Sequence, residues 1–237
     1  MVKFWVAFAL LVAAIGVFAH WDGPPLGGNW FSFGGDADSE EKTRGSGIAA
    51  SEARTVGEFS RIHAEGASVI EVQVKDGLAR SVEISADNNL LRLIDTDVTD
   101  GVLEISPSAS FSPLGDVQVK ITSPSLAGIH LEGANRLRLV IDSKSDLDLH
   151  IEGAGRVQAS GNVGQLTVHS EGAGSIDAVE LIARGVDVRI EGAGRATVNA
   201  TESLKARIEG AGYVRYGGNP ARVEKNVDGI GHISRIE

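Results

Sequence analysis

The sequence of 237 residues contains no cysteine, and aromatic residues make up only 5% of it. The absence of cysteine excludes disulfides, thiol nucleophiles, cysteine-based zinc sites and a lipid-modified cysteine. The scarcity of aromatic residues argues against a large globular core and fits a thin domain filled with small aliphatic side chains. The net charge of −10 argues against a nucleic-acid partner.

The clearest unbroken apolar run of the chain spans residues 4–19, at the N-terminus. A helix of that length reaches about 24 Å, which is less than the ~30 Å hydrocarbon core of a bilayer. The sequence before His20 fits signal-peptide cleavage, whereas Trp5 and Trp21 fit the interfacial anchors of an uncleaved helix. Residues 1–19 are therefore a signal peptide or a membrane anchor, and the remainder of the chain is exported in either case.

Composition divides the rest of the chain into two parts. Residues 20–55 are rich in glycine, proline and charged side chains and predict a flexible linker. A patterned domain follows over residues 56–237, and its first part, residues 56–126, is less regular than residues 127–237.

A short phrase of the form His-Ile-Glu-Gly-Ala-Gly recurs throughout the regular part. The acidic residues of its copies are Glu132, Glu152, Glu171, Glu191, Glu209 and Asp228. A fixed period of about 20 residues is the mark of a stacked-repeat architecture. On both sides of each Gly-Ala-Gly, apolar residues alternate with polar ones, which predicts strands with one buried face.

These patterns predict an all-β fold, a parallel β-solenoid with coils of about 19–20 residues. Each coil would contain a strand, a glycine-rich corner, a second strand and a loop. One coil cannot bury its own apolar face, but coils stacked at about 4.8 Å form a continuous core. Residues 56–126 would begin or cap the solenoid.

A second column of side chains lies two residues before each acidic residue. It contains His63, His130, His150, His169, Arg189 and Arg207. Since residues i and i+2 of a strand share a face, each coil would present a cation beside a carboxylate on its outer surface. Further arginines, Arg136, Arg156 and Arg195, follow the corner and could also face the carboxylates.

Two interpretations of this surface stay open. In the first, it is a solvated face on which cations offset a row of glutamates. In the second, imidazole and carboxylate groups bind Zn²⁺ or another divalent ion. The candidate ligands are His130, His150, His169, Glu132, Glu152 and Glu171. The sequence indicates no other cofactor and no catalytic residue.

The order of several short motifs resembles one bacterial family. The motifs are Gly57-x-Phe59-x-x-Ile62, then Asp87-Asn88-Asn89-Leu90, then Asp100-Gly101-Val102, then the serial Gly-Ala corners and finally Tyr216-x-Gly218-x-Pro220. Together they resemble the head GIN domain, or putative auto-transporter adhesin domain, from about residue 56 to the C-terminus. The resemblance implies an exported β-helix-like fold without established catalytic residues.

The sequence therefore predicts an exported, non-catalytic module of the periplasm or cell surface that presents a flat charged ladder. Its partner would be a surface glycan, an envelope component or a protein. The alternative is a polysaccharide-active or metal-dependent β-helix enzyme, for which Asp146, Asp148, Asp187 and Arg189 are the nearest catalytic material. An enzyme would need a concave site, whereas repeated short side chains make a flat one.

Overall fold

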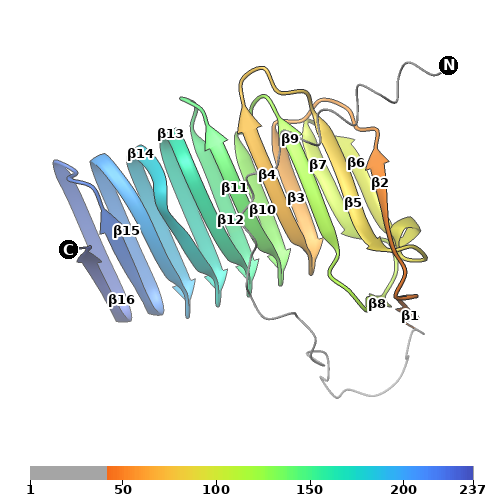
Figure 1. Cartoon of the computed structure of the whole chain (residues 1–237). Helices are drawn as coiled ribbons and strands as arrows, with labels where there is room; N and C mark the ends of the chain where they lie inside the picture. The colour runs from red at the N-terminus through yellow and green to blue at the C-terminus, as the bar shows by residue number, and fades with distance from the viewer. Residues whose placement is uncertain (1–41, 237) are drawn as a thin grey trace. The chain divides into compact units, whose positions relative to one another are not determined.

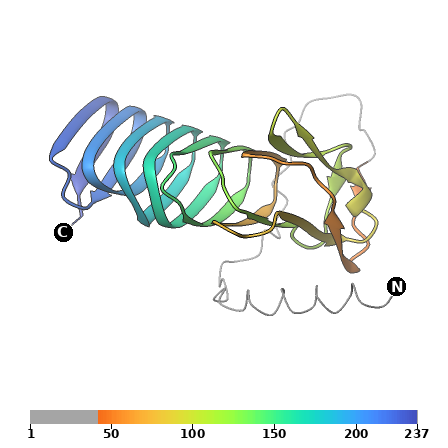
Figure 2. The same cartoon turned by 90° about the horizontal axis from the view of Figure 1, so that it is seen from above.

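The computed structural model describes residues 42–236, which form a solenoid of mostly parallel β-strands. In Figure 1 the strands lie side by side, and β16 is at the opposite end from β2. In Figure 2 the ribbon of the regular part returns on itself once per coil, one layer further along. The predicted all-β parallel solenoid is confirmed for this part of the chain. The predicted signal or anchor helix lies outside the described residues.

The regular coils stack in the register that the repeat predicts. Their strands are β10 (Gly128–Gly133), β11 (Arg136–Asp142), β12 (Leu147–Gly153), β13 (Arg156–Gly172), β14 (Ser175–Gly192), β15 (Arg195–Gly217) and β16 (Arg222–Arg235). Glu132 is paired with Glu152, and Glu152 with Glu171. The same file continues through Glu191 and Glu209. One period of the sequence is therefore one coil of the structure.

The irregular first part builds the opposite end. Strands β3 (Arg61–Gly66) and β4 (Val69–Lys75) pair in parallel with β10 and β11 and form the first coil that contains the repeated phrase. The chain then runs back to the other side of this coil. It does so through β5 (Ser81–Asp87), the 3₁₀ turn η2 (Leu91–Leu93), β6 (Ile94–Thr99), β7 (Val102–Pro107), β8 (Phe111–Ser112) and β9 (Gln118–Ser123).

Strand β7 pairs in parallel with β3, and β9 pairs in parallel with β4. On the outer side, β6 pairs antiparallel with β7, and β5 pairs antiparallel with β9. The long interval between Glu65 and Glu132 is thus an insertion that forms the end layer, and the two glutamates are direct neighbours.

The predicted linker over residues 20–55 is wrong for its last part. Strand β1 (Thr43–Arg44) pairs with β8, and β2 (Ala49–Arg54) pairs antiparallel with β5. Most side chains of β2 are exposed, so no apolar alternation reveals it in the sequence. Backbone hydrogen bonds to β5 hold this edge strand, and they require no particular side chains.

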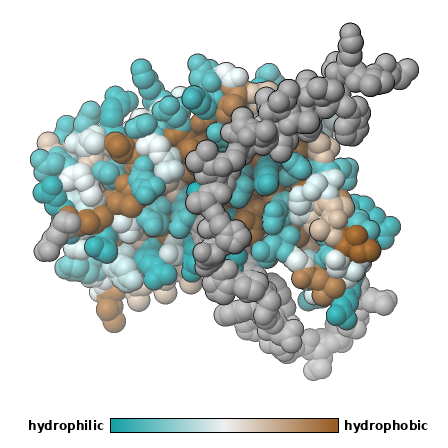
Figure 3. Space-filling model, in the orientation of Figure 1, coloured by the Kyte–Doolittle hydropathy of each residue, from teal (hydrophilic) through white to brown (hydrophobic). Residues whose placement is uncertain are grey.

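The core consists of aliphatic columns inside the coils. The position before each acidic residue is fully buried in four successive coils, where it is Leu131, Ile151, Ser170 and Ile190. Ser170 is the polar exception, and its buried hydroxyl has no hydrogen-bond partner among the described residues. Figure 3 shows hydrophilic side chains over much of the visible face of the C-terminal coils, with hydrophobic side chains between them.

The first glycine of each corner is required by the backbone. Gly133, Gly153, Gly172 and Gly192 have φ between 97° and 107°, which side chains rarely tolerate. The corners also bond to one another, since Ala154 N donates to Gly133 O at 2.9 Å and Ala173 N donates to Gly153 O at 2.8 Å. Glycine at these positions thus lets successive coils approach closely.

Asn135 replaces the second glycine of the first regular corner and is 1% exposed. Its side-chain oxygen accepts hydrogen bonds from Ser68 N at 3.1 Å and Ser68 Oγ at 2.8 Å. Its side-chain nitrogen donates to Glu132 O at 2.8 Å. This amide therefore ties the corner to the preceding coil.

Within residues 42–236, no helix is long and apolar enough to cross a membrane. The apolar run over residues 4–19 is outside that range, so the choice between a cleaved signal and a retained anchor stays a prediction.

Candidate functional site

Four histidines form a single stack on the outside of the solenoid. Parallel register places His63 beside His130, His130 beside His150, and His150 beside His169. Their ring centroids are 4.6, 4.5 and 4.8 Å apart, and the planes of successive rings differ by 11–19°. We call these four histidines, together with Glu132, Glu152, Glu171 and Glu191, the histidine–glutamate ladder.

Most rungs of the ladder are linked to the next coil. The Nε2 atom of His63 lies 2.9 Å from Glu132 Oε1, and that of His169 lies 3.0 Å from Glu191 Oε1. His130 Nε2 makes the same link to Glu152 Oε1 at 3.1 Å. The histidine side chains are 24–35% exposed, so these contacts are only partly screened by water.

His150 is the exception in the stack. Its Nε2 atom is buried from solvent and has no hydrogen-bond partner among the described residues. The nearest carboxylate oxygens are Glu152 Oε1 at 3.4 Å and Glu171 Oε1 at 3.6 Å. The backbone register thus holds this nitrogen between two carboxylates without a hydrogen bond to either.

Arginine replaces histidine at the C-terminal end of the column. Arg189 Nε lies 2.6 Å from Glu191 Oε1, and Arg189 Nη2 lies 3.1 Å from Glu209 Oε1. Cations therefore separate the carboxylates of neighbouring rungs, as expected for a charged outer face. Arg195, from the column after the corner, instead donates from Nε to Ser175 Oγ at 2.8 Å.

The ladder brings together every metal-ligand candidate of the sequence. Three overlapping groups each place two imidazole nitrogens and one carboxylate oxygen within 4.8 Å of one another. They are His63 with His130 and Glu132, His130 with His150 and Glu152, and His150 with His169 and Glu171. Two imidazoles and a carboxylate are a ligand set that suits Zn²⁺ and similar ions.

The acidic residues considered for catalysis do not form a cluster. Asp146 Oδ1 accepts a hydrogen bond from Gln165 N at 2.8 Å, in a loop. Asp148 Oδ2 lies 3.4 Å from Arg61 Nη2, and Asp187 Oδ2 lies 3.6 Å from Lys205 Nζ. Each carboxylate therefore has a different partner. Asp148 and Asp187 are also not in adjacent coils, because Thr167 of β13 lies between them in the stack.

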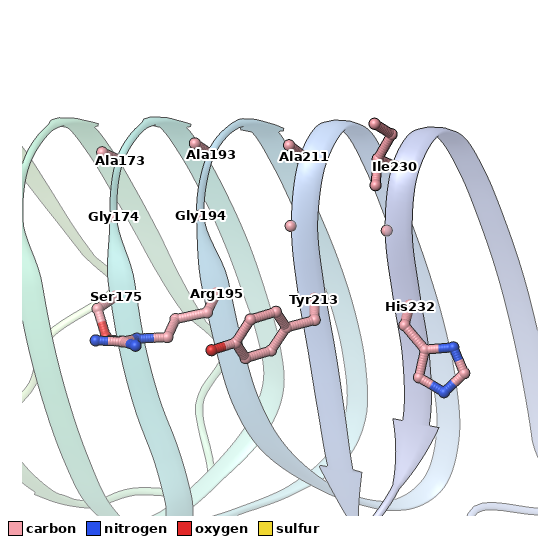
Figure 4. A pocket seen from close by; sticks show the side chains of 12 residues that line it. Ala173, Gly174, Ser175, Ala193, Gly194, Arg195, Ala211, Tyr213, Ile230 and His232 are labelled. Atoms are coloured by element: carbon pink, nitrogen blue, oxygen red, sulfur yellow. Dashed lines mark hydrogen bonds between the residues drawn. The ribbon is translucent and has the colours of Figure 1, made fainter.

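A hollow of about 590 Å³ lies along the corners of the C-terminal coils. Figure 4 shows its two rows of side chains. One row follows the corners, with Ala173, Ala193, Ala211 and Ile230, and the other contains Ser175, Arg195, Tyr213 and His232. Arg195 and Tyr213 lean toward the preceding coil in this view. The lining contains no carboxylate, and 47% of Tyr213 is exposed. We call this hollow the corner groove.

Sequence reasoning did not identify the corner groove, although its signal was present. Ser175, Arg195, Tyr213 and His232 occupy the column four residues after each acidic residue, the column that also contains Arg156. The prediction considered only its arginines, as partners for the glutamates. The corner glycines also leave the hollow open, in addition to their role in the backbone geometry.

Comparison with known proteins gives one family and several structures. A family model described as putative auto-transporter adhesin, head GIN domain, matches residues 58–220. The crystal structure of a putative adhesin from Bacteroides fragilis is similar with a TM-score of 0.59 and 28% identity, over 81% of this chain and 99% of that chain. Comparison with curated proteins gave no match.

A second crystal structure, of a putative lipid binding protein from Parabacteroides distasonis, has a TM-score of 0.52 and 20% identity. The similarity covers 83% of this chain and 100% of that chain. At this identity the likeness shows a shared fold.

Proposed function

The chain belongs to the putative auto-transporter adhesin, head GIN domain family, and from this premise we propose that it is an exported, non-catalytic binding module of the cell envelope. It presents a flat charged ladder to an extended, hydroxyl-rich polymer such as a surface glycan. The predicted leader over residues 1–19 supports export, whether it is cleaved or retained.

One observation carries the proposal: the same side chains repeat in register along one flank. A linear polymer can contact several coils at once, because equivalent groups recur at each layer of the stack. Contacts that are weak singly become strong when they are linked along one polymer. Carboxylate, imidazole and guanidinium groups together can accept and donate hydrogen bonds to sugar hydroxyls.

The corner groove supports a binding function for a second reason. It has an exposed aromatic ring, an arginine and open backbone, whereas a glycosidase needs a pair of carboxyl groups. Tyr213 offers an apolar ring face and a polar tip, which suits the mixed surface of a sugar. The net charge of −10 disfavours strongly acidic polymers.

The test is a polysaccharide array that is probed with the full chain. We expect binding to neutral polymers that strengthens with polymer length, and loss of binding by about tenfold or more, or about 1.4 kcal/mol, in the double variant Glu171→Gln/Glu191→Gln. Tyr213→Ala tests the groove. Glu202→Gln, which changes an exposed glutamate outside the ladder, is the matched control.

Two results would overturn the proposal. Binding that is absent from every polymer, or equal in the ladder variant and in Glu202→Gln, would remove the ladder as the contact surface. Release of new reducing ends or unsaturated sugars during incubation would establish the alternative, an enzyme that acts on polysaccharides.

A further inference from the structure

We propose that the centre of the histidine–glutamate ladder binds one divalent transition-metal ion of the zinc type. The ligands are Nε2 of His130, Nε2 of His150 and the carboxylate of Glu152. This proposal does not depend on the polymer-binding function, because it rests on side-chain geometry within two adjacent coils.

The ligand atoms are already near the spacing that such an ion requires. Zinc bonds of about 2.0–2.1 Å in a tetrahedron set neighbouring ligand atoms about 3.3 Å apart. Glu152 Oε1 lies 3.1 Å from His130 Nε2 and 3.4 Å from His150 Nε2. The two rings are the closest pair in the stack, at 4.5 Å between centroids. One ring nitrogen of each histidine and one carboxylate oxygen of Glu152 all lie within 4.8 Å of one another.

The unsatisfied nitrogen of His150 is the second observation. A buried polar atom without a partner costs stability, and the ladder gives this one no hydrogen bond. A metal ion placed between His130 and His150 would satisfy it through the lone pair of the neutral ring. The backbone register fixes the imidazole in that place, since His130 and His150 are paired residues of β10 and β12.

The donor set defines the chemical class of the ion. Two imidazoles and one carboxylate suit zinc and neighbouring transition metals, whereas calcium and magnesium prefer sets made wholly of oxygen. The side chains of His130, His150 and Glu152 are 32%, 35% and 42% exposed. A fourth ligand, water or a group of a partner, can therefore reach the ion from solvent.

The neighbouring groups fit an ion less well and compete for the same ligands. Glu132 Oε1 lies 2.9 Å from His63 Nε2 but 3.7 Å from His130 Nε2, so it is placed less evenly between its two imidazoles than Glu152 Oε1 is. Glu171 Oε1 lies 3.6 Å from His150 Nε2 and 3.5 Å from His169 Nε2, which are both longer than the distances at Glu152. Each of these groups shares a histidine with the central one. The proposal therefore predicts one ion per chain.

The experiment is calorimetric titration of Zn²⁺ into the metal-stripped full chain, prepared without a histidine tag. We expect one site per chain. His130→Ala, His150→Ala and Glu152→Gln should each weaken zinc binding by more than about 100-fold, because even an outer-shell change costs about 10–100-fold. His63→Ala and His169→Ala should keep the single site. Circular dichroism of each variant checks that the solenoid is folded.

Two controls separate the site from general surface binding. Glu209→Gln removes a carboxylate of the same column where the neighbouring cation is Arg189, and it should leave zinc affinity unchanged. His232→Ala removes an exposed histidine outside the ladder and should also have no effect.

Three results would overturn the proposal. The first is the absence of binding heat above that of buffer. The second is zinc affinity that survives in His150→Ala and Glu152→Gln. The third is two ions per chain, with one lost in His63→Ala and one in His169→Ala, which would assign binding to the outer groups instead.

Discussion

At the scale of the residue, the first glycine of each corner decides how closely two coils can stack. Gly153 has φ +104°, and a Cβ atom built on it would lie 2.6 Å from Gly133 O. Both the conformation and the space exclude a side chain. The chain offers two glycines that separate these causes: Gly77, with φ +82° and open surroundings, and Gly115, with no atom within 4 Å and no such φ.

We predict that Gly153→Ala is the most destabilising of three alanine substitutions. It combines backbone strain of about 1–3 kcal/mol with a similar cost of displacing the adjacent coil. Gly77→Ala should be destabilised by the backbone strain alone. The free energy of unfolding of Gly115→Ala should stay within about 1 kcal/mol of that of the parent. Urea unfolding of the three variants gives the free energies of unfolding. Equal losses at the three positions would contradict this account.

Individual side chains of the site differ in how well the sequence predicts their positions. The ladder was predictable, because a constant period and strand alternation fix which residues share a face. The burial of Asn135 was not, since its partner Ser68 is far away in sequence and lies in the preceding coil. The unsatisfied state of His150 depends on differences of a few tenths of an ångström, which no residue pattern contains.

At the scale of the element, the coil is the unit of construction. Strand β14 contacts β13 on one side and β15 on the other, and both pairings keep the corner glycines in register. Nearest-neighbour packing of this kind makes each coil exchangeable with the next. The sequence that begins at Glu171 and the sequence that begins at Glu191 are identical over four residues, Glu-Gly-Ala-Gly.

We predict that deletion of residues 172–191 leaves a folded, shorter solenoid. The deletion joins Glu171 to Gly192 and preserves the phrase, so β13 can stack directly on β15. Far-UV circular dichroism, size-exclusion chromatography and thermal unfolding would show a cooperative β-protein. A control that deletes residues 172–181 removes half a coil together with the corner Gly172-Ala173-Gly174, so the coils that follow can no longer stack in register, and it should abolish cooperative unfolding. The same outcome for both deletions would refute the modular account.

At the scale of the whole described solenoid, the two ends differ in protection. The N-terminal end is covered by antiparallel strands, namely β2 on β5 and β6 on β7. Among the described strands, β16 pairs only with β15, and most of its side chains are exposed. Stability in such a stack decreases where neighbours are missing.

We therefore predict a gradient of hydrogen exchange along the C-terminal coils. Backbone amides of β16 should exchange about tenfold or more faster than those of β14, because opening β16 breaks one interface and opening β14 breaks two. Exchange measured by mass spectrometry on peptides from each strand would check this. Equal protection would indicate that another surface covers β16 in solution.

The repeat in the amino-acid sequence is sufficient to predict the architecture of the regular part. Its period set the length of a coil, its alternation set the buried face, and its glycines marked the corners, because these are local properties of the chain. Three features appear only in the folded chain: the order of the first strands, the pairing of β2 with β5, and the unpartnered nitrogen of His150. Those features depend on contacts between residues distant in sequence, for which a single chain of letters has no periodic signal.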